Sequence, residues 1–228
     1  MVLPTASGRG GRAAATRRRF SRALPILLGV LGSIPARATT YSVPRFSDTA
    51  IVSGLAAPTD FAFLPDGRIL ILELPGRVRI VGPNGGPPAL AADLTGIVAN
   101  TASERGLLGI CLHPGFATNG YVYLYFTTAP GGVTRNRISR FTFSGSTLSA
   151  ASETIILDNI SSQNGNHNGG TVLIGPDGKL WAAPGDSGTG GAKAQNLSPY
   201  PYEGAFSGKL LRMELDGSPA AGNPFIGD

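Results

Sequence analysis

Short apolar runs, separated by clusters of Gly, Pro, Asn and Asp, recur along most of the chain. No run keeps an apolar period of 3.6 residues over ten residues, so the pattern predicts strands and turns and no helix. Tyr121–Phe126 is apolar on both faces, which is typical of a strand buried between packed sheets. Arg77–Ile80 alternates polar and apolar residues, as a half-exposed strand does. The expected strands are Asp60–Leu64, Arg68–Leu72, Arg77–Val81, Leu107–Leu112, Tyr121–Thr127, Asn136–Phe143, Thr154–Leu157, Thr171–Ile174, Lys179–Ala183 and Lys209–Leu215.

Three segments share one longer pattern, which is an apolar strand, a turn led by proline and a second apolar strand. Their first residues and turn prolines are Phe61 and Pro65, Cys111 and Pro114, and Val172 and Pro176. The turn prolines recur at intervals of roughly 50–60 residues, near the length of known blade repeats. A period of ~40–50 residues with several strands per repeat is typical of β-propeller blades, and a β-sandwich with accidental similarity is the alternative. Because the repeated unit is the same hairpin each time, the pattern favours the propeller.

The length and composition refine this fold. Only three hairpin units fit into the 228 residues, whereas a propeller needs ~4–8 blades to close its ring. We therefore expect an all-β, incomplete propeller of about three blades, whose first and last sheets leave faces uncovered. The 33 Gly and 18 Pro fit a chain rich in turns, and the 14% of charged residues argues against a coiled coil or a long helical bundle. The single cysteine, Cys111, excludes an intrachain disulfide and a cysteine-based metal cluster.

The positive net charge of +5 is concentrated at the N-terminus, since residues 1–38 hold seven arginines and no acidic residue. The rest of the chain carries 12 Lys and Arg against 14 Asp and Glu, a net charge of −2, so the body lacks a basic face for nucleic acid. Thr16–Arg22 is similar to a twin-arginine box, an apolar run from Ala23 to Pro35 follows, and Ala36–Ala38 has the A-x-A form of a cleavage site. The apolar run is shorter than the ~20 residues that span a bilayer. Residues 1–38 are thus predicted to be an export signal of the twin-arginine type, with a disordered basic tail as the alternative, and the exported protein is expected in the periplasm or outside the cell.

One pair of residues, His167 and Asp186, is a candidate for acid–base catalysis. The hairpin with its turn at Pro176–Gly178 pairs residues whose numbers add to about 353 or 354, and His167 and Asp186 satisfy this relation. They are therefore expected to face each other at the open end of the hairpin, where neighbouring glycines leave room for a ligand. A carboxylate beside an imidazole fixes its tautomer and stabilises the imidazolium, which suits a general base. A structural His–Asp hydrogen bond in a loop is the alternative.

Other polar positions are weaker candidates. Asp60 and Glu73 are expected to face each other at the end of the first hairpin, as a solvated pair or as carboxylates that bind calcium or share a proton. His113 is expected to be structural, because no neighbour in the sequence would act with it. Cys111 is expected to be buried and inert, and Trp181 to belong to the core.

Four segments together resemble a known family. They are "GLAAPTDFAFLPDGRILILE", "SERGLLGICLHPGFATNGYVYLYFT", "NHNGGTVLIGPDGKLWAAPGD" and "GKLLRMELDGSPAAGNPF". In this order they resemble the soluble glucose/sorbosone dehydrogenases, which are six-bladed propellers that use pyrroloquinoline quinone. The resemblance covers most of residues 51–226 and corresponds to the N-terminal half of the family's domain.

The resemblance implies roles for particular residues. His167 corresponds to the catalytic base and Asp186 to the acid that orients it. Glu104, Arg105 and Asn168 correspond to residues that line the cofactor. The implied reaction oxidises the anomeric hydroxyl of an aldose to a lactone: the histidine takes the hydroxyl proton and a hydride passes to the quinone, which a calcium ion polarises. The implied partners are an aldose and an external electron acceptor, with no nucleic acid and no membrane span.

The sequence also departs from the family. Thr171 stands where an arginine or a leucine is frequent, so the sugar preference is open. The family's Arg-Asn-Pro motif, which grips the quinone, and its main calcium ligands come later than Asp228. We therefore expect residues 39–228 to form a partial, C-terminally truncated domain that is inactive alone, either as a fragment or as a decayed relative. The alternative function is a non-enzymatic propeller that binds a partner protein, as in hedgehog-interacting proteins, which share the "NHNGG" and "ERGLLG" motifs.

Overall fold

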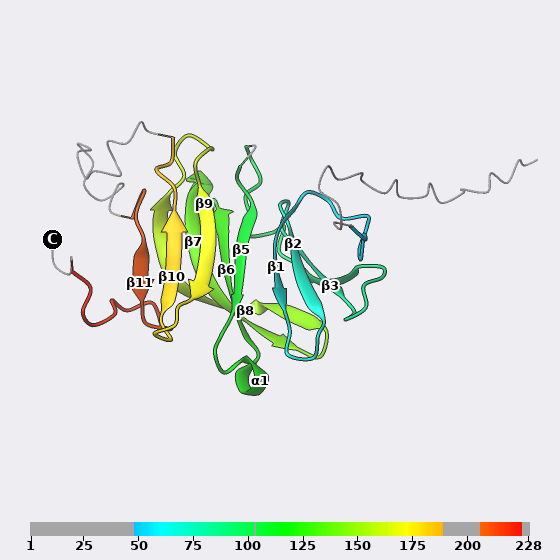
Figure 1. Cartoon of the computed structure of the whole chain (residues 1–228). Helices are drawn as coiled ribbons and strands as arrows, with labels where there is room; N and C mark the ends of the chain where they lie inside the picture. The colour runs from blue at the N-terminus through cyan, green and yellow to red at the C-terminus, as the bar shows by residue number, and fades with distance from the viewer. Residues whose placement is uncertain (1–47, 103, 189–205, 225–228) are drawn as a thin grey trace, which may run out of the picture. The chain divides into compact units, whose positions relative to one another are not determined.

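The computed structural model describes residues 48–102, 104–188 and 206–224. The predicted leader, residues 1–38, and its boundary lie outside these ranges. Eleven strands and two short helical turns are present in them (Figure 1). They are β1 (Pro58–Phe63), β2 (Ile69–Glu73), β3 (Arg77–Val81), β4 (Ala89–Asp93), β5 (Leu107–Leu112), α1 (Phe116–Asn119), β6 (Tyr121–Thr128), η1 (Pro130–Gly132), β7 (Arg135–Ser144), β8 (Thr147–Ser161), β9 (Gly169–Ile174), β10 (Leu180–Pro184) and β11 (Leu211–Met213).

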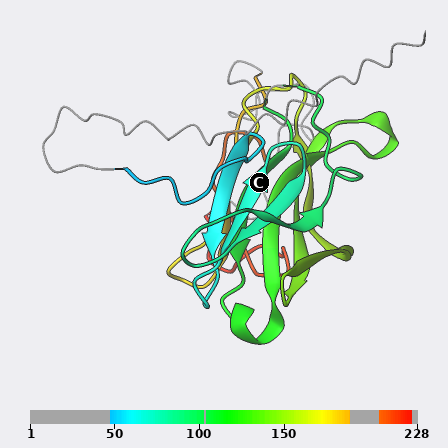
Figure 2. The same ribbon diagram turned by 90° about the vertical axis from the view of Figure 1, so that its right-hand side faces the viewer.

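The strands form three antiparallel sheets in chain order. The first sheet is β1-β2-β3-β4, the second is β5-β6-β7-β8, and the third is β9-β10-β11. The first strand of the second sheet, β5, contacts both β1 and β9, so the first strands of the three sheets lie side by side (Figures 1 and 2). Successive antiparallel meanders with adjacent first strands are the blades of a β-propeller. The described residues thus form a partial propeller of about three blades, as the hairpin repeat predicts.

Two apolar layers hold the three blades together. Leu70, Leu72 and Phe126 belong to the layer between the first and second sheets, and none of their surface is exposed. Tyr123 and Val172 belong to the layer between the second and third sheets. The central strand β6 supplies side chains to both layers, which explains why its sequence is apolar on both faces. Each fully buried large side chain of this kind contributes roughly 1.5–3 kcal/mol to folding.

The blades approach most closely where β5 passes β9. A Cβ atom on Gly109 would overlap the backbone oxygen of Gly170 on the neighbouring strand. Only a residue without a side chain fits between the two backbones. Gly109 therefore sets the distance between the second and third blades next to the His167 hairpin.

The expectation that the chain has no helix is wrong at Phe116–Asn119, a single α-helical turn that ends at Gly120 with φ of 64°. One turn is too short to show a helical period, so the apolar pattern could not reveal it. The pattern also omits β4, whose alanines have a low strand propensity. It places only four residues of β8 in a strand, because much of this strand is polar and exposed.

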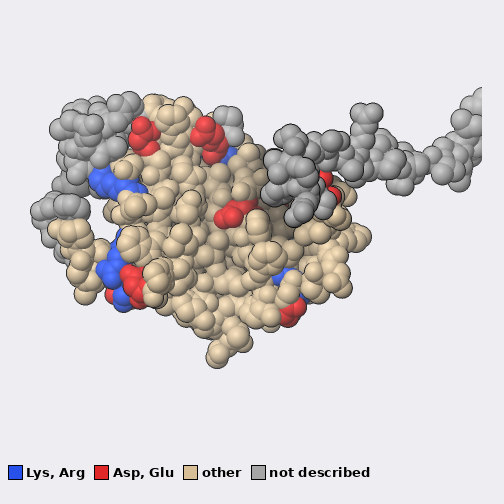
Figure 3. Space-filling model, viewed as in Figure 1, with Lys and Arg blue, Asp and Glu red and all other residues tan. Residues whose placement is uncertain are grey.

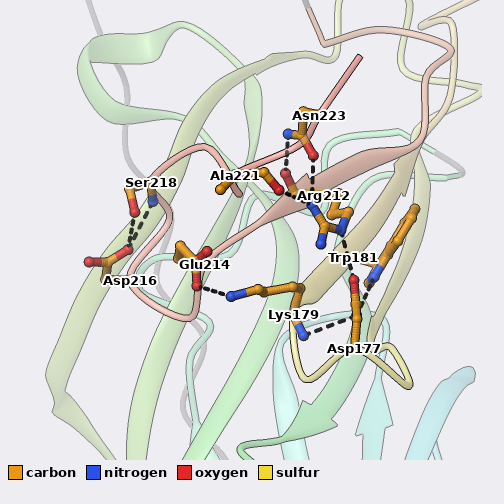
Figure 4. A network of polar contacts seen from close by, with 9 residues as sticks. All are labelled: Asp177, Lys179, Trp181, Arg212, Glu214, Asp216, Ser218, Ala221 and Asn223. Carbon is orange, nitrogen blue, oxygen red and sulfur yellow. Dashed lines mark hydrogen bonds and ion pairs between the residues drawn. The ribbon is translucent and has the colours of Figure 1, made fainter. Parts of the chain in front are cut away.

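A polar network closes the lower end of the third blade, at the hairpin turn (Figure 4). Asp177 in the turn accepts hydrogen bonds from Arg212 Nε at 2.7 Å and from Trp181 Nε1 at 3.1 Å. Arg212 also donates to the backbone oxygen of Ala221 at 2.9 Å. The hydrogen bonds to Asp177, with that of Arg212 first, lower the pKa of this carboxyl to about 2. The network connects the turn to β11 and to the loop after it, and it leaves the opposite end of the hairpin open.

Candidate functional site: a His–Asp pair on the blade rim

His167 and Asp186 lie at the open end of the β9–β10 hairpin. The ladder runs regularly from Leu180 to Ala183 and shifts by one residue before Pro184, which brings the two side chains opposite each other. His167 Nδ1 is 2.8 Å from Asp186 Oδ1. The predicted contact is therefore present, while the catalytic role of the pair stays a prediction.

The geometry assigns the proton on the imidazole. An ionised carboxylate only accepts hydrogen bonds, so the proton lies on Nδ1 of His167 and the Nε2 atom of the neutral ring has a free lone pair. The His167 side chain is 58% exposed, whereas that of Asp186 is 25% exposed. The ring therefore presents Nε2 at the surface of the rim, where a ligand hydroxyl can reach it.

The backbone around His167 is held in an unusual conformation. His167 has φ of 54°, in the left-handed region that residues other than glycine adopt rarely, although Asn, Asp and His adopt it more often than other residues do. Glu104 Oε2 accepts a hydrogen bond from the His167 N–H at 2.5 Å, and Ser187 N–H donates to the His167 carbonyl oxygen at 3.1 Å. At Gly185, a Cβ atom would overlap that same oxygen. Local packing on both sides thus fixes the direction in which the imidazole points.

A buried polar network supports the site from below. Asn168 is only 1% exposed, and its Nδ2 donates to the backbone oxygen of Glu104 at 3.2 Å. Its Oδ1 accepts from Asn136 Nδ2 at 3.1 Å and from Ser162 Oγ at 2.7 Å. Tyr125 donates its hydroxyl proton to the Asn168 carbonyl oxygen at 2.9 Å, and burial raises the pKa of this phenol, so it remains a donor. The second blade therefore fixes the residue that follows His167.

Arg105 lies beside this network. Its Nε donates to Ser162 Oγ at 3.0 Å, and its Nη2 donates to the backbone oxygens of Ser162 and Gln163. Its Nη1 lies 3.3 Å from Thr101 Oγ1. The guanidinium thus binds the loop that leads to His167. Of the three residues expected to line a cofactor, Glu104 alone is exposed, since Arg105 is half-buried and Asn168 is buried.

The second carboxylate pair does not form a joint site. Glu73 is fully buried and pairs with Arg79 Nε at 2.9 Å, while its other oxygen accepts from the Ala56 N–H. Asp60 accepts from the Ile110 N–H at 3.0 Å, because a bulge shifts the first hairpin before Phe61. Across the described ranges, no three His, Cys, Asp or Glu side chains gather as a metal site would require. The expectation of facing carboxylates is therefore wrong.

The remaining candidates have structural surroundings. His113 Nδ1 accepts from the Gly115 N–H at 2.8 Å in the turn before α1, and burial lowers the pKa of this imidazole. Cys111 is half-buried and not fully buried as expected, and the desolvation of its thiol raises the pKa to about 12, which agrees with an inert cysteine. Trp181 is half-buried on the third sheet and lies under the guanidinium of Arg212, so it is not a core residue.

The sequence analysis missed the supporting residues of the second blade. Asn136 and Thr127 are fully buried and hydrogen-bonded to each other at 2.7 Å. Both lie in strands whose other buried residues are mostly apolar. A polar residue at a buried strand position is the signal that could have marked them, because such groups need partners.

The fold and the rim define the class of this chain: an incomplete β-propeller that presents a carboxylate-oriented histidine at one end of a blade. The profile of the glucose/sorbosone dehydrogenases matches residues 55–228. The chain therefore belongs to the glucose/sorbosone dehydrogenase family, a family of sugar-dehydrogenase-like oxidoreductases.

Solved structures agree with this assignment. A putative glucose dehydrogenase from Thermus thermophilus is 38% identical with a TM-score of 0.67, and the match covers 78% of this chain and 50% of that one. The PQQ-bound aldose sugar dehydrogenase of Streptomyces coelicolor is 34% identical with a TM-score of 0.66, covering 79% and 51%.

Curated relatives give the same family and one different function. Quinoprotein glucose dehydrogenase B of Acinetobacter calcoaceticus is 27% identical over 222 residues, 87% of this chain and 46% of the relative. The mouse Hedgehog-interacting protein is 30% identical over 183 residues, 73% of this chain and 25% of the relative. The chain thus spans about half the length of its dehydrogenase relatives. In the ranges that the structure describes, no helix has the length and apolar character needed to cross a membrane.

Proposed function

We propose that this chain carries the catalytic base of a quinoprotein sugar dehydrogenase, which oxidises the anomeric hydroxyl of an aldose to a lactone. The observation that carries the proposal is the exposed imidazole of His167 with its Nδ1 held by Asp186 at 2.8 Å. Family membership supplies the reaction class, and the PQQ-bound Streptomyces relative supplies the cofactor class.

The residues of this chain act on the proton of the substrate. His167 Nε2 accepts the proton of the anomeric hydroxyl, and the carboxylate of Asp186 stabilises the imidazolium that results. Glu104 and the buried amide of Asn168 hold the backbone on either side of the ring. Because the ring is fixed before the substrate binds, little reorganisation is needed during proton transfer.

The described residues fit only part of the cofactor's requirements. Pyrroloquinoline quinone, when bound, supplies the hydride acceptor. Its carboxylates need cationic partners, and the guanidinium of Arg105 is engaged with Ser162 and Gln163 in the loop that leads to His167. Among the described residues, no three His, Cys, Asp or Glu side chains gather at one point, so these side chains alone do not form a metal site. The chain therefore supplies the base, and the anchoring of quinone and calcium is assigned to the part of the family domain that this chain does not match.

We also propose that the protein is exported. The support is the order of the arginine box, the apolar run and the A-x-A site in residues 1–38. An external acceptor would then take the electrons from the reduced cofactor outside the cytoplasm.

The second candidate function is a propeller module that binds a partner protein. The similarity to Hedgehog-interacting protein favours it, as does the engagement of Arg105 within the chain. The propeller fold alone does not distinguish the two functions. A measurement of quinone binding distinguishes them, because only the dehydrogenase requires the quinone.

The test joins residues 39–228 to the second half of the Streptomyces aldose sugar dehydrogenase and measures dye reduction by aldoses with added quinone and calcium. We expect activity in the joined protein and none in the 228-residue chain. His167→Ala should lower turnover of the joined protein by roughly 10²-fold or more with little change in quinone affinity. His113→Ala, which removes the other histidine of the chain, should leave turnover unchanged.

Two results would count against the proposal. A joined protein that binds quinone and is equally active with and without His167 would remove this residue from the mechanism. A folded joined protein that binds no quinone would leave the binding-module function as the better explanation.

A further inference from the structure

The turn that carries Asp186 has two consecutive residues in the left-handed region, since φ is 63° at Ser187 and 68° at Gly188. Glycine adopts this region without cost, whereas serine adopts it rarely and where its surroundings hold it there. A Cβ atom on Gly188 would overlap Oδ1 of Asn166, so the turn lies closely against the loop before His167. The residue whose conformation needs an explanation is therefore Ser187.

Ser187 is the buried centre of the contact between this turn and that loop. None of its surface is exposed. Its Oγ accepts a hydrogen bond from the Gln163 N–H at 2.7 Å and lies 3.1 Å from Ser161 Oγ. Its own N–H donates to the His167 carbonyl oxygen at 3.1 Å. Ser187 thus joins the turn to the loop through both its side chain and its backbone.

The Asp186 carboxylate is fixed within its turn, but the turn alone does not direct it to the imidazole. Its Oδ1 accepts from the Gly188 N–H at 3.0 Å, as aspartate side chains do toward the backbone two residues on. The same Oδ1 is 2.8 Å from His167 Nδ1. The local hydrogen bond sets the carboxylate relative to its own backbone. The position of the whole turn relative to His167 therefore decides whether Oδ1 reaches Nδ1.

A second carboxylate beside His167 makes this placement important. Glu104 Oε2 accepts a hydrogen bond from the His167 N–H, and acidic side chains lie along the upper rim of the molecule, over the open end of the β9–β10 hairpin (Figure 3). The His167 side chain is 58% exposed, so packing holds the ring only in part. Its orientation and its tautomer then depend on the hydrogen bond that Nδ1 makes.

We propose that Ser187 is a positioning residue, whose buried hydroxyl holds the Asp186 turn against the His167 loop and thereby keeps the carboxylate on Nδ1. Nε2 of the neutral ring is then left unprotonated and accepts the proton of a ligand hydroxyl. A further contact, from Asn164 Nδ2 to the Gly188 oxygen, is exposed to water and contributes less. The catalytic importance of Ser187 rests on the proposed function of His167 as the base, but its effect on the tautomer does not.

The first experiment determines the tautomer of the His167 ring in the 228-residue chain from its ¹⁵N signals, at a pH where the ring is neutral. The wild type should carry the proton mainly on Nδ1, and Ser187→Ala should lose this preference because the carboxylate is no longer held on that atom. Ser139→Ala is the matched control. Ser139 is also fully buried, and its hydroxyl donates to Glu153 Oε1 at 2.8 Å in the second blade, so this variant loses a buried hydrogen bond but should keep the wild-type tautomer.

A second variant, Ser187→Gly, separates the hydroxyl from the backbone conformation. Glycine lacks the hydroxyl and adopts left-handed φ without cost, so this variant should fold even if Ser187→Ala does not. We expect it to lose the Nδ1 preference as well. If the glycine variant keeps the wild-type tautomer, the left-handed backbone alone places the carboxylate and the proposal is wrong. A folded Ser187→Ala with an unchanged tautomer, or a wild type with its proton on Nε2, would overturn it too.

The second experiment measures turnover in the protein that joins residues 39–228 to the second half of the Streptomyces dehydrogenase. Ser187→Ala should lower turnover roughly 10–100-fold with little change in quinone affinity, because the base is misplaced and the cofactor is not. Ser139→Ala should leave turnover unchanged.

The two experiments distinguish a failure of this inference from a failure of the proposed function. If Ser187→Ala changes the tautomer but no joined protein is active, the positioning by Ser187 is confirmed and the proposed function is not. If the joined protein is active and Ser187→Ala changes neither turnover nor tautomer, the proposed function stands and Ser187 is not a positioning residue.

Discussion

Asn168→Ala tests whether the buried amide beneath His167 holds the site. The substitution removes three hydrogen bonds, one to Glu104, one from Asn136 and one from Ser162. A typical hydrogen bond contributes about 1 kcal/mol net, so the three together contribute about 3 kcal/mol. Two of the three former partners keep another hydrogen bond after the substitution: Asn136 Nδ2 still donates to the Ser161 oxygen, and Ser162 Oγ still accepts from Arg105. The substitution therefore leaves neither of these buried groups without a partner, and the free energy of unfolding does not fall further on their account.

The measurement is the free energy of unfolding in urea for the variant and the wild type. The slope m, which is the dependence of this free energy on urea concentration, should be the same for both proteins if only the stability has changed. For a domain of this size, about 3 kcal/mol corresponds to a melting temperature lower by roughly 6–12 °C. Asn164→Ala is the control, because its exposed amide makes one hydrogen bond, to Gly188, and its loss should cost under ~1 kcal/mol. A second readout is the ¹⁵N signals of the His167 ring, which should broaden or shift in Asn168→Ala only.

Two outcomes would refute this reasoning. If the stability of Asn168→Ala lies within about 0.5 kcal/mol of the wild type, the range usual for surface substitutions, the amide is not a structural support. If stability falls but the His167 ring signals are unchanged, the network stabilises the blade without positioning the imidazole.

Further predictions concern the leader, a glycine and a turn. N-terminal sequencing of exported protein should begin at or near Thr39, and an intact leader on a soluble cytoplasmic protein would contradict the export proposal. Gly109→Ala should lower the free energy of unfolding in urea by about 1–3 kcal/mol because its Cβ meets the backbone of β9, whereas Gly96→Ala, whose Cβ meets nothing, should be nearly neutral. The pKa of Asp177 is lowered to about 2 from 3.8 by Arg212, so its stabilising contribution is full above about pH 4 and is lost as the pH falls through about 2. The stability difference between wild type and Asp177→Asn should therefore shrink over this range, and a difference that is constant with pH would refute the ion pair.

The sequence by itself determined the local features of this protein. An antiparallel hairpin with a known turn fixes which residues face each other, so the position of the Pro-Asp-Gly turn sufficed to bring His167 to Asp186. The apolar pattern likewise determined most strands and the blade-like repeat. A half-exposed strand alternates polar and apolar residues and a strand buried on both faces is apolar throughout, so consecutive residues are enough to recognise either kind.

The tertiary structure decided everything that joins one blade to another. The same pairing arithmetic failed for Asp60 and Glu73, because a bulge shifts the register and each carboxylate binds a partner that the hairpin pairing does not contain, Ile110 for Asp60 and Arg79 for Glu73. The carbonyl oxygen of Asn168 and the hydroxyl of Tyr125 meet across two blades although they are far apart in the sequence. Residue periodicity shows that a position is buried but does not show which distant strand buries it, so the support of His167 becomes visible only when the blades are packed.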